Sequence, residues 1–431
     1  MKNQNLSTLI EYAYRHVKYY HELFNKIGID ASLIQSSEDL IKIPILKKDT
    51  IQEQMTDFIS DEYQKFPKNE NVVIKRTSGS TGKYLKIYWD YKDDIKSLMP
   101  LWTLRSRLYG IDPKMKWCSF YSTRYEGNKI KPLLPKEVAL NGRYMGFSKI
   151  GLTYKKIEDN YRDILEFNPD WLLLQPSIAY LMSQIVKEHN LPVPSNLKYI
   201  EMSGEYLFDN YKKQIEETFD VYTANQYGCN EANEIAYEFK CRNMHVIENN
   251  VIVEVLKDGK PVINEEGDIY VTSLKNFAMP FIRYQTGDRG ILITDHNCSC
   301  KNKAPILKVN SGRSSDFLLL ENGEKMNSYV LANIVEYTNE NMSSAIKQFQ
   351  ITQTDINKFN VNLVVKSSYS GWKNAISECF LDNIQEEELK NAKWNFIFSD
   401  EICPQFGGNV TFDEIGLICS EFHLMTFFQL F

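Results

Sequence analysis

Apolar residues near the start of the chain lie at helical spacing. They recur every three or four residues, at Leu9, Ala13, Val17, Tyr20 and Phe24. This spacing predicts an amphipathic helix with one buried face. The segment from Thr8 to Glu11 has the Thr-x-x-Glu pattern of a capping box, which marks the N-terminus of a helix.

Strand patterns and helix patterns then alternate. Residues 72–74 and 85–89 predict two strands, which flank a Gly-rich segment at residues 77–83. From residue 98 to residue 255, helix-like stretches alternate with short apolar runs such as residues 171–174. This rhythm is typical of a sheet covered by helices.

The later part of the chain has a different pattern. Residues 251–293 alternate as strands do and contain turn signals such as Asp258-Gly259, which predicts a β-rich subdomain. Beyond residue 313, the hairpin signal Asn322-Gly323 and a strand pattern at residues 361–364 predict an α+β unit. We therefore predict an α/β fold with two domains. They are a large N-terminal domain of helix-covered sheets plus the β-rich subdomain, residues 1–313, and a small α+β C-terminal domain, residues 314–431.

Composition and charge narrow the class of protein. Of 431 residues, 43% are hydrophobic and 25% are charged, which excludes a disordered, collagen-like or membrane-embedded chain. A net charge of −6 lacks the basic footprint of nucleic-acid-binding proteins, so we expect no nucleic-acid partner. The sequence has neither a secretory signal pattern nor an apolar run long enough to cross a bilayer. We expect a cytoplasmic protein that does not enter a membrane.

The Gly-rich segment suits the binding of an anion. Its glycines, hydroxyl groups and lysine are those of a loop whose amides and side chains hold phosphate oxygens. It is not a Walker A sequence, because Tyr84 stands where that motif has Ser or Thr. A plain polar hairpin turn is the alternative interpretation. The residues concerned are Thr77, Ser78, Gly79, Ser80, Thr81, Gly82 and Lys83.

Four residues have the chemistry of a metal site. Eight cysteines are too few for a disulfide scaffold of this length, so free thiols or metal ligands are expected. Cys241 and His245 are four residues apart, and Cys298 and Cys300 form a second close pair. Thiolates and imidazole together are the ligands of a closed tetrahedral Zn²⁺ site. We predict a structural zinc at these residues, with ordinary reduced thiols as the alternative.

Five motifs along the chain resemble the phenylacetate-CoA ligase branch of the adenylate-forming (acyl-CoA synthetase-like) enzymes, which includes capsule-biosynthesis adenylation proteins. Residues 77–83 resemble the phosphate loop of this family, and Ser203-Gly204-Glu205 resembles its adenine-edge turn. The other three are Gln226-Tyr227-Gly228-Cys229-Asn230-Glu231, Arg283-Tyr284-Gln285-Thr286-Gly287-Asp288 and Gly312-Arg313-Ser314-Ser315-Asp316. The resemblance implies the adenylate-forming fold over nearly the whole chain.

The resemblance also implies a role for each matching residue. Gly204 and Glu205 line the adenine site, and Tyr227 offers an aromatic face to the base. Asp288 accepts both ribose hydroxyl groups, and Arg313 reaches ribose or phosphate. The carboxylate of Glu231 binds the Mg²⁺ that bridges the ATP phosphates. The implied catalytic residues are Lys83, Glu231 and Arg313.

The implied reaction is ATP-dependent and forms AMP. A small carboxylic acid is activated as an acyl-adenylate, and the acyl group then passes to CoA or to another thiol or amine. Aromatic side chains lie where the acyl pocket of the family falls, which favours an aryl or arylacetic acid, although such residues are also typical of a core. They are Tyr121, Tyr125, Tyr144 and Phe147. The sequence leaves open the acid, the acceptor and whether the protein is a homodimer.

One departure from the family concerns a lysine late in the small domain. In the family, this lysine stabilises charge on the α-phosphate, and here Gly407-Gly408-Asn409 occupies its place. Asn409 carries no charge, so adenylation would lose a large electrostatic contribution unless Lys390 or Lys393 replaces the missing group. The alternative function is therefore a nucleotide-binding homologue that acts only as an acyltransferase or as a regulatory protein.

Overall fold

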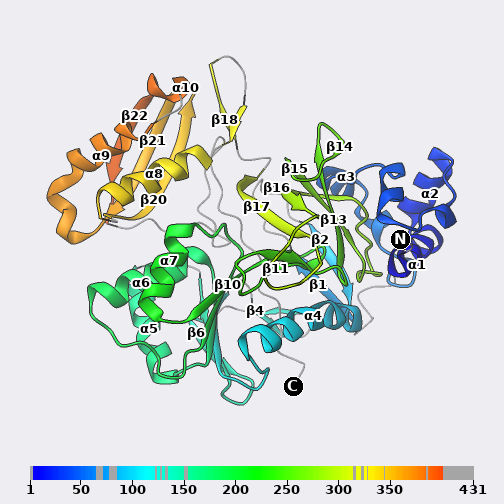
Figure 1. Cartoon of the computed structure of the whole chain (residues 1–431), viewed down its shortest axis with the longest axis horizontal. Helices are drawn as coiled ribbons and strands as arrows, with labels where there is room; N and C mark the ends of the chain where they lie inside the picture. Colours follow the sequence, from blue (N-terminus) through cyan, green and yellow to red (C-terminus); the bar gives the residue numbers. More distant parts are fainter. Residues whose placement is uncertain are drawn as a thin grey trace.

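The computed structural model describes residues 3–64, 71–76, 85–121, 124–126, 129–131, 134–149, 154–313, 317–321, 325–327, 329–343, 345–384 and 387–400. Its largest element is one mixed sheet (Figure 1). The neighbouring strands in one half of this sheet run parallel, in the order β7 (Tyr144–Ser148), β3 (Trp117–Tyr121), β8 (Trp171–Leu174), β9 (Tyr199–Ser203) and β10 (Tyr222–Cys229). The antiparallel strand β6 (Lys136–Ala139) pairs with β7 at the edge.

Helices cover both faces of this parallel half. One face carries α5 (Tyr154–Phe167), α6 (Pro176–Glu188) and α7 (Asp209–Phe219), and the other carries α4 (Tyr91–Tyr109). Strand β8 shows why: Leu172 and Leu174 pack with α5 to α7, whereas Trp171 and Leu173 pack with α4. A four-residue strand that is apolar at every position is the pattern of a strand buried on both faces.

The sheet continues past β10 as antiparallel strands. In spatial order they are β11 (Asn233–Glu238), β12 (Met244–Val246), β17 (Ile306–Arg313), β16 (Tyr284–Ile293), β15 (Glu266–Ser273), β13 (Val251–Lys257) and β14 (Lys260–Pro261). These strands include the predicted β-rich subdomain. A separate antiparallel pair is formed by β1 (Val72–Arg76) and β2 (Lys86–Asp90), as the alternation predicted.

The predicted first helix is two helices, α1 (Gln4–His16) and α2 (Lys18–Ile27). Val17 between them has an extended backbone, which breaks the helix while its side chain stays in the core. The five predicted apolar residues are all buried, so the predicted face is confirmed. The capping box at Thr8 was wrong: Asn3 caps α1 by accepting from the amide of Leu6 at 3.1 Å, and the Thr8 hydroxyl donates within the helix to the Gln4 carbonyl.

The N-terminal helices pack against the antiparallel half of the sheet, together with β1 and β2 (Figure 1). This part also contains α3 (Lys48–Glu53) and three short 3-10 helices, η1 (Ala31–Leu33), η2 (Ser37–Lys42) and η3 (Met55–Phe58). A small hairpin outside the main sheet is formed by β4 (Arg124–Glu126) and β5 (Lys129–Lys131).

The C-terminal part has an apolar core of its own, which begins at Leu318. Its sheet has the order β20 (Ile346–Asp355), β21 (Lys358–Val365) and β22 (Lys393–Phe398). The other elements are β18 (Phe317–Leu319), β19 (Lys325–Asn327), α8 (Tyr329–Asn341), η4 (Ser367–Trp372), α9 (Lys373–Asp382) and α10 (Glu387–Lys390). The α/β class with an α+β C-terminal part is confirmed, and the boundary between residues 313 and 314 stays a prediction.

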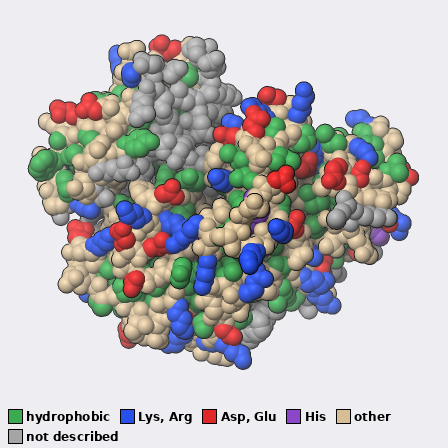
Figure 2. Space-filling model, in the orientation of Figure 1, with side chains coloured by type: hydrophobic (Ala, Val, Ile, Leu, Met, Phe, Trp, Pro, Cys, Tyr) green, Lys and Arg blue, Asp and Glu red, His purple; other side chains and the backbone are tan. Residues whose placement is uncertain are grey.

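Charged side chains of both signs are interspersed over the face shown in Figure 2. Within the described ranges, no helix combines the length and the apolar composition that crossing a bilayer requires.

Candidate functional site

Two predicted motifs meet through side chains of the β10–β11 hairpin and of β16. The Tyr227 hydroxyl, on β10, donates to Oδ2 of Asp288, on β16, at 2.7 Å. The Tyr284 hydroxyl, on β16, donates in return to Oε1 of Glu231, in the hairpin turn, also at 2.7 Å. Each element therefore supplies one tyrosine and one carboxylate, and the two carboxylates are held by reciprocal bonds.

The hairpin is shaped by a close approach of its two strands. A Cβ atom on Gly228 would lie 2.4 Å from the Asn233 carbonyl oxygen, so only glycine fits at this position. Tyr227 and Glu231 are nearly buried, and Asp288 is half-buried. Burial, followed by the charge of Asp288, raises the pKa of Tyr227 well above its ordinary value, so its hydroxyl remains a donor.

The predicted adenine-edge turn lies next to this hairpin. Ser203 at the end of β9 pairs with Gln226 of β10, the residue before Tyr227. Gly204 then turns the chain with φ = 92°, a conformation that favours glycine. The Glu205 carboxylate accepts from the amide and the hydroxyl of Ser177, both at 3.0 Å, and so holds the first turn of α6.

Arg313 lies opposite Asp288 in the backbone pairing of β16 and β17. Four of the five motifs are thus represented here, by Gly204, by Tyr227 and Glu231, by Asp288, and by the backbone of Arg313. The predicted phosphate loop, Thr77, Ser78, Gly79, Ser80, Thr81, Gly82 and Lys83, lies outside the described residues, as do Asp316 and Asn409. The strands that flank this loop are described, and Arg76 pairs with Lys86.

Two further residues of the β16 motif have structural roles that the sequence did not predict. One is Tyr284, the donor to Glu231. The other is Arg283, which is buried, has φ = 53° and forms a bidentate ion pair with Glu254. Its guanidinium also donates to the Ile43 carbonyl at 2.6 Å and so anchors the start of β16. Their place in the motif was the one sequence feature that could have indicated a role. The residues that they bind are distant in sequence, so these contacts could not be predicted.

The residues predicted to bind metal converge. The ligand atoms of Cys241, His245, Cys298 and Cys300 all lie within 4.8 Å of one another. Nδ1 of His245 lies 2.9 Å from the Ala304 carbonyl oxygen, so a proton on Nδ1 leaves Nε2 facing the sulfur atoms. Burial opposes ionisation of Cys298, but hydrogen bonds with Cys300, Cys241 and Asn243 lower the pKa of this thiol to about 6. The donor set fits a tetrahedral Zn²⁺ ion.

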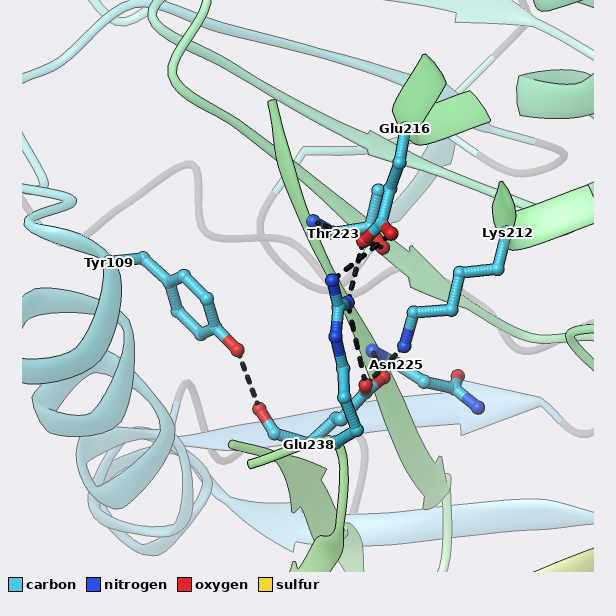
Figure 3. Close-up of polar contacts among 7 residues, drawn as sticks. Tyr109, Lys212, Glu216, Thr223, Asn225 and Glu238 are labelled. Carbon is cyan, nitrogen blue, oxygen red and sulfur yellow. Dashed lines mark hydrogen bonds and ion pairs between the residues drawn. The ribbon is translucent and has the colours of Figure 1, made fainter. Parts of the chain in front are cut away.

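A polar network fixes the turn that carries Cys241 (Figure 3). Glu238, at the end of β11, accepts from Lys212 and from the amide of Asn225, and its carbonyl accepts from Tyr109. Arg242 forms a bidentate pair with Glu216 at 2.6 and 3.0 Å. The group of Cys241, His245, Cys298 and Cys300 is therefore connected through these residues to α7, α4 and β10, the strand that carries Tyr227.

Two of the residues proposed for an acyl pocket, Phe147 and Tyr144, lie on opposite faces of the sheet. Phe147 is fully buried among the side chains beneath α5 to α7, which agrees with the alternative that such aromatic residues belong to the core. Tyr144 is also buried, and its hydroxyl shares a hydrogen bond of 2.9 Å with Ser119. The Tyr121 hydroxyl donates to the Leu134 carbonyl, and the side chain of Tyr125 lies outside the described residues.

Comparisons with known proteins identify relatives of this chain. Residues 318–412 match the family model of the CapK C-terminal domain. A phenylacetate-coenzyme A ligase of Thermus thermophilus is 25% identical over 337 residues, which span 74% of this chain and 71% of that protein. The corresponding enzyme of Escherichia coli is 22% identical, over 78% of this chain and 76% of that protein.

Solved structures show the same fold. A 2-hydroxyisobutyryl-CoA ligase in the postadenylation state, in complex with R3-HIB-AMP, superposes with a TM-score of 0.68 at 16% identity. The match covers 92% of this chain and 84% of that one. The same kind of enzyme in complex with 2-HIB-AMP and CoA, in the thioesterification state, gives a TM-score of 0.60 at 19% identity, over 93% and 86% of the two chains. The predicted resemblance to the phenylacetate-CoA ligases and the adenylate-forming fold are confirmed.

Proposed function

We propose that this homologue of the phenylacetate-CoA ligases is an ATP-dependent, AMP-forming acid–thiol ligase. The observation that carries the proposal is the reciprocal pairing of Tyr227 with Asp288 and of Tyr284 with Glu231, which presents two carboxylates from neighbouring elements. The motif resemblance assigns Asp288 to ribose and Glu231 to Mg²⁺. The relatives are CoA ligases, as the main hypothesis predicted.

Each carboxylate has a separate role in this reaction. Asp288 is half-buried, and its carboxylate accepts from the Tyr227 hydroxyl. A carboxylate has two oxygen atoms that can accept hydrogen bonds, which suits a ribose diol. Glu231 is 5% exposed and offers hard oxygen ligands, which fit Mg²⁺. Mg²⁺ would neutralise charge on the phosphates and leaving pyrophosphate. Tyr284 keeps Glu231 oriented before ATP binds.

The acceptor and the acid complete the proposal. We propose CoA as the acceptor, because the relatives are CoA ligases and a structural neighbour binds CoA. An aryl or arylacetic acid remains the proposed substrate class, which the name of the Thermus thermophilus relative supports. We propose the cytoplasm as the compartment, since it supplies ATP and CoA and keeps thiols reduced.

The test is exchange of labelled pyrophosphate into ATP across a panel of small carboxylic acids. We expect exchange that requires both Mg²⁺ and an acid, with arylacetic acids among the best substrates. A second assay follows release of AMP and formation of a thioester when CoA is added. If the protein binds ATP but no acid supports exchange or thioester formation, the ligase function is rejected and the regulatory alternative remains.

We also propose that Cys241, His245, Cys298 and Cys300 bind one structural Zn²⁺ ion. Protein purified without added zinc should contain about one equivalent. Cys298→Ser should lose this metal and lower the Tm by about 5–10 °C, because metal binding contributes to folding. The matched control is Cys379→Ser on α9, a cysteine outside the cluster. Full metal content and an unchanged Tm in Cys298→Ser would show that this ligand set is wrong.

A further inference from the structure

A buried lysine joins three segments beside the candidate site. Lys75 lies on β1, two residues before the predicted phosphate loop begins, and its side chain is 1% exposed. Its ammonium group donates to Oδ1 of Asp94, on α4, at 2.5 Å and to Oδ1 of Asn233 at 2.6 Å. It also lies 4.8 Å from the centre of the Trp89 ring, on β2. These partners satisfy a charge that would be costly to bury alone.

Asn233 connects this lysine to the turn that carries Glu231. It pairs with Cys229 and so closes the β10–β11 hairpin, with φ = 57°. Its amide nitrogen donates to Asp94 at 2.9 Å and to the Ser97 hydroxyl at 2.5 Å. Both ends of the Asn233 side chain are therefore engaged, one by Lys75 and the other by α4.

A second contact holds the same turn. The indole nitrogen of Trp89 donates to the carbonyl oxygen of Asn230, the residue before Glu231, at 2.8 Å. Trp89 is fully buried and lies opposite Val73 in the β1–β2 pair. The Glu231 turn is thus bound on one side through Asn230 and on the other through Asn233, and both contacts lead back to the β1–β2 pair.

We propose that Lys75 is a positioning residue that holds the Glu231 turn against β1, the strand that leads to the phosphate loop. This inference rests on the proposed function. A buried ion pair is often replaceable by apolar side chains without loss of stability, so its contribution here is geometric: it fixes where the magnesium-binding carboxylate stands. Such placement matters because small displacements of a reacting group or metal ligand reduce the rate strongly.

Two variants test the positioning role without leaving an unpaired buried charge. Lys75→Met/Asp94→Leu removes the ion pair as a unit. Asn233→Gly removes only the connecting amide, and glycine adopts the positive φ of this position without strain. Lys96→Met is the matched control, since Lys96 lies on α4 beside Asp94 but pairs with Asp93 in an exposed contact.

For both variants we expect the concentration of Mg²⁺ at half-maximal pyrophosphate exchange to rise roughly tenfold and kcat to fall by a similar factor. KM for the acid should stay unchanged, as should the affinity for ATP measured by calorimetry without Mg²⁺. Calorimetry with Mg²⁺ should show the loss directly as a smaller gain in ATP affinity. If the folded variants keep the Mg²⁺ dependence of wild type and Lys96→Met, Lys75 is only structural and the proposal is rejected.

The calorimetric arm separates this proposal from the proposed function. If the wild-type protein shows Mg²⁺-dependent ATP binding but no acid supports pyrophosphate exchange, the ligase function is rejected. Loss of the Mg²⁺ dependence in Asn233→Gly would then still support positioning of Glu231, and its retention would overturn it.

Discussion

Asp288→Ala is expected to weaken Mg²⁺–ATP binding about a hundredfold. A carboxylate that accepts two ribose hydroxyl groups makes charge-assisted hydrogen bonds, and their loss is worth roughly 3 kcal/mol. The carboxylate is held in place by Tyr227 at 2.7 Å, so it is oriented before the nucleotide arrives. Calorimetry with ATP and Mg²⁺ measures the change, and pyrophosphate exchange should fall in parallel.

Two variants separate ribose binding from local packing. Tyr227→Phe keeps the ring but removes the bond to Asp288, so it should weaken ATP binding by roughly tenfold or less. Asp288→Asn keeps the shape and one acceptor oxygen and should lie between the other two variants. Equal Kd values for Asp288→Ala and wild type, with an unchanged Tm, would contradict the ribose assignment.

The sequence predicted features whose chemistry is local. Thiolates and an imidazole are a common set of metal ligands, so the convergence of the three cysteines and His245 could be predicted although the two pairs lie more than fifty residues apart. The apolar face from Leu9 to Phe24 was predicted correctly, because burial follows periodicity. The break at Val17 was not, because one extended residue can split a helix without disturbing that period.

The contacts that the sequence did not predict depend on pairing between segments that are distant in the chain. Lys75 and Asn233 are 158 residues apart, and no local pattern around either one indicates the other. Tyr284 stands in a recognised motif, but only the packing of β16 against the hairpin reveals its bond to Glu231. For Phe147 the sequence left open a pocket or the core, and it is a core residue because its strand is covered by α5 to α7.

Asn409→Lys is expected to raise pyrophosphate exchange by at least about tenfold. A cation would be restored where negative charge gathers on the α-phosphate and the incoming carboxylate, and such groups often contribute roughly a hundredfold or more to the rate. Asn409 lies outside the described residues, so this expectation rests on the sequence and on the family. Labelled pyrophosphate exchange, at saturating ATP and acid, measures it.

The two half-reactions should respond differently. In the family, the small domain rotates between adenylation and acyl transfer, and the lysine leaves the site for the second step. Acyl transfer from a chemically synthesised acyl-adenylate to CoA should therefore change little in Asn409→Lys. A gain in exchange without a gain in transfer would identify the missing cation as the reason for slow adenylation.

Two exposed lysines could supply the cation in place of residue 409, which would contradict this expectation. Lys390 ends α10 and Lys393 begins β22, so both lie on the C-terminal part that precedes residue 409. If wild-type exchange is already fast, Asn409→Lys is neutral and Lys390→Met or Lys393→Met abolishes exchange, the cation has moved to a new position in the chain. Fast exchange that none of the three substitutions alters would mean that residue 409 does not occupy the position of the family's lysine, and that the cation comes from elsewhere.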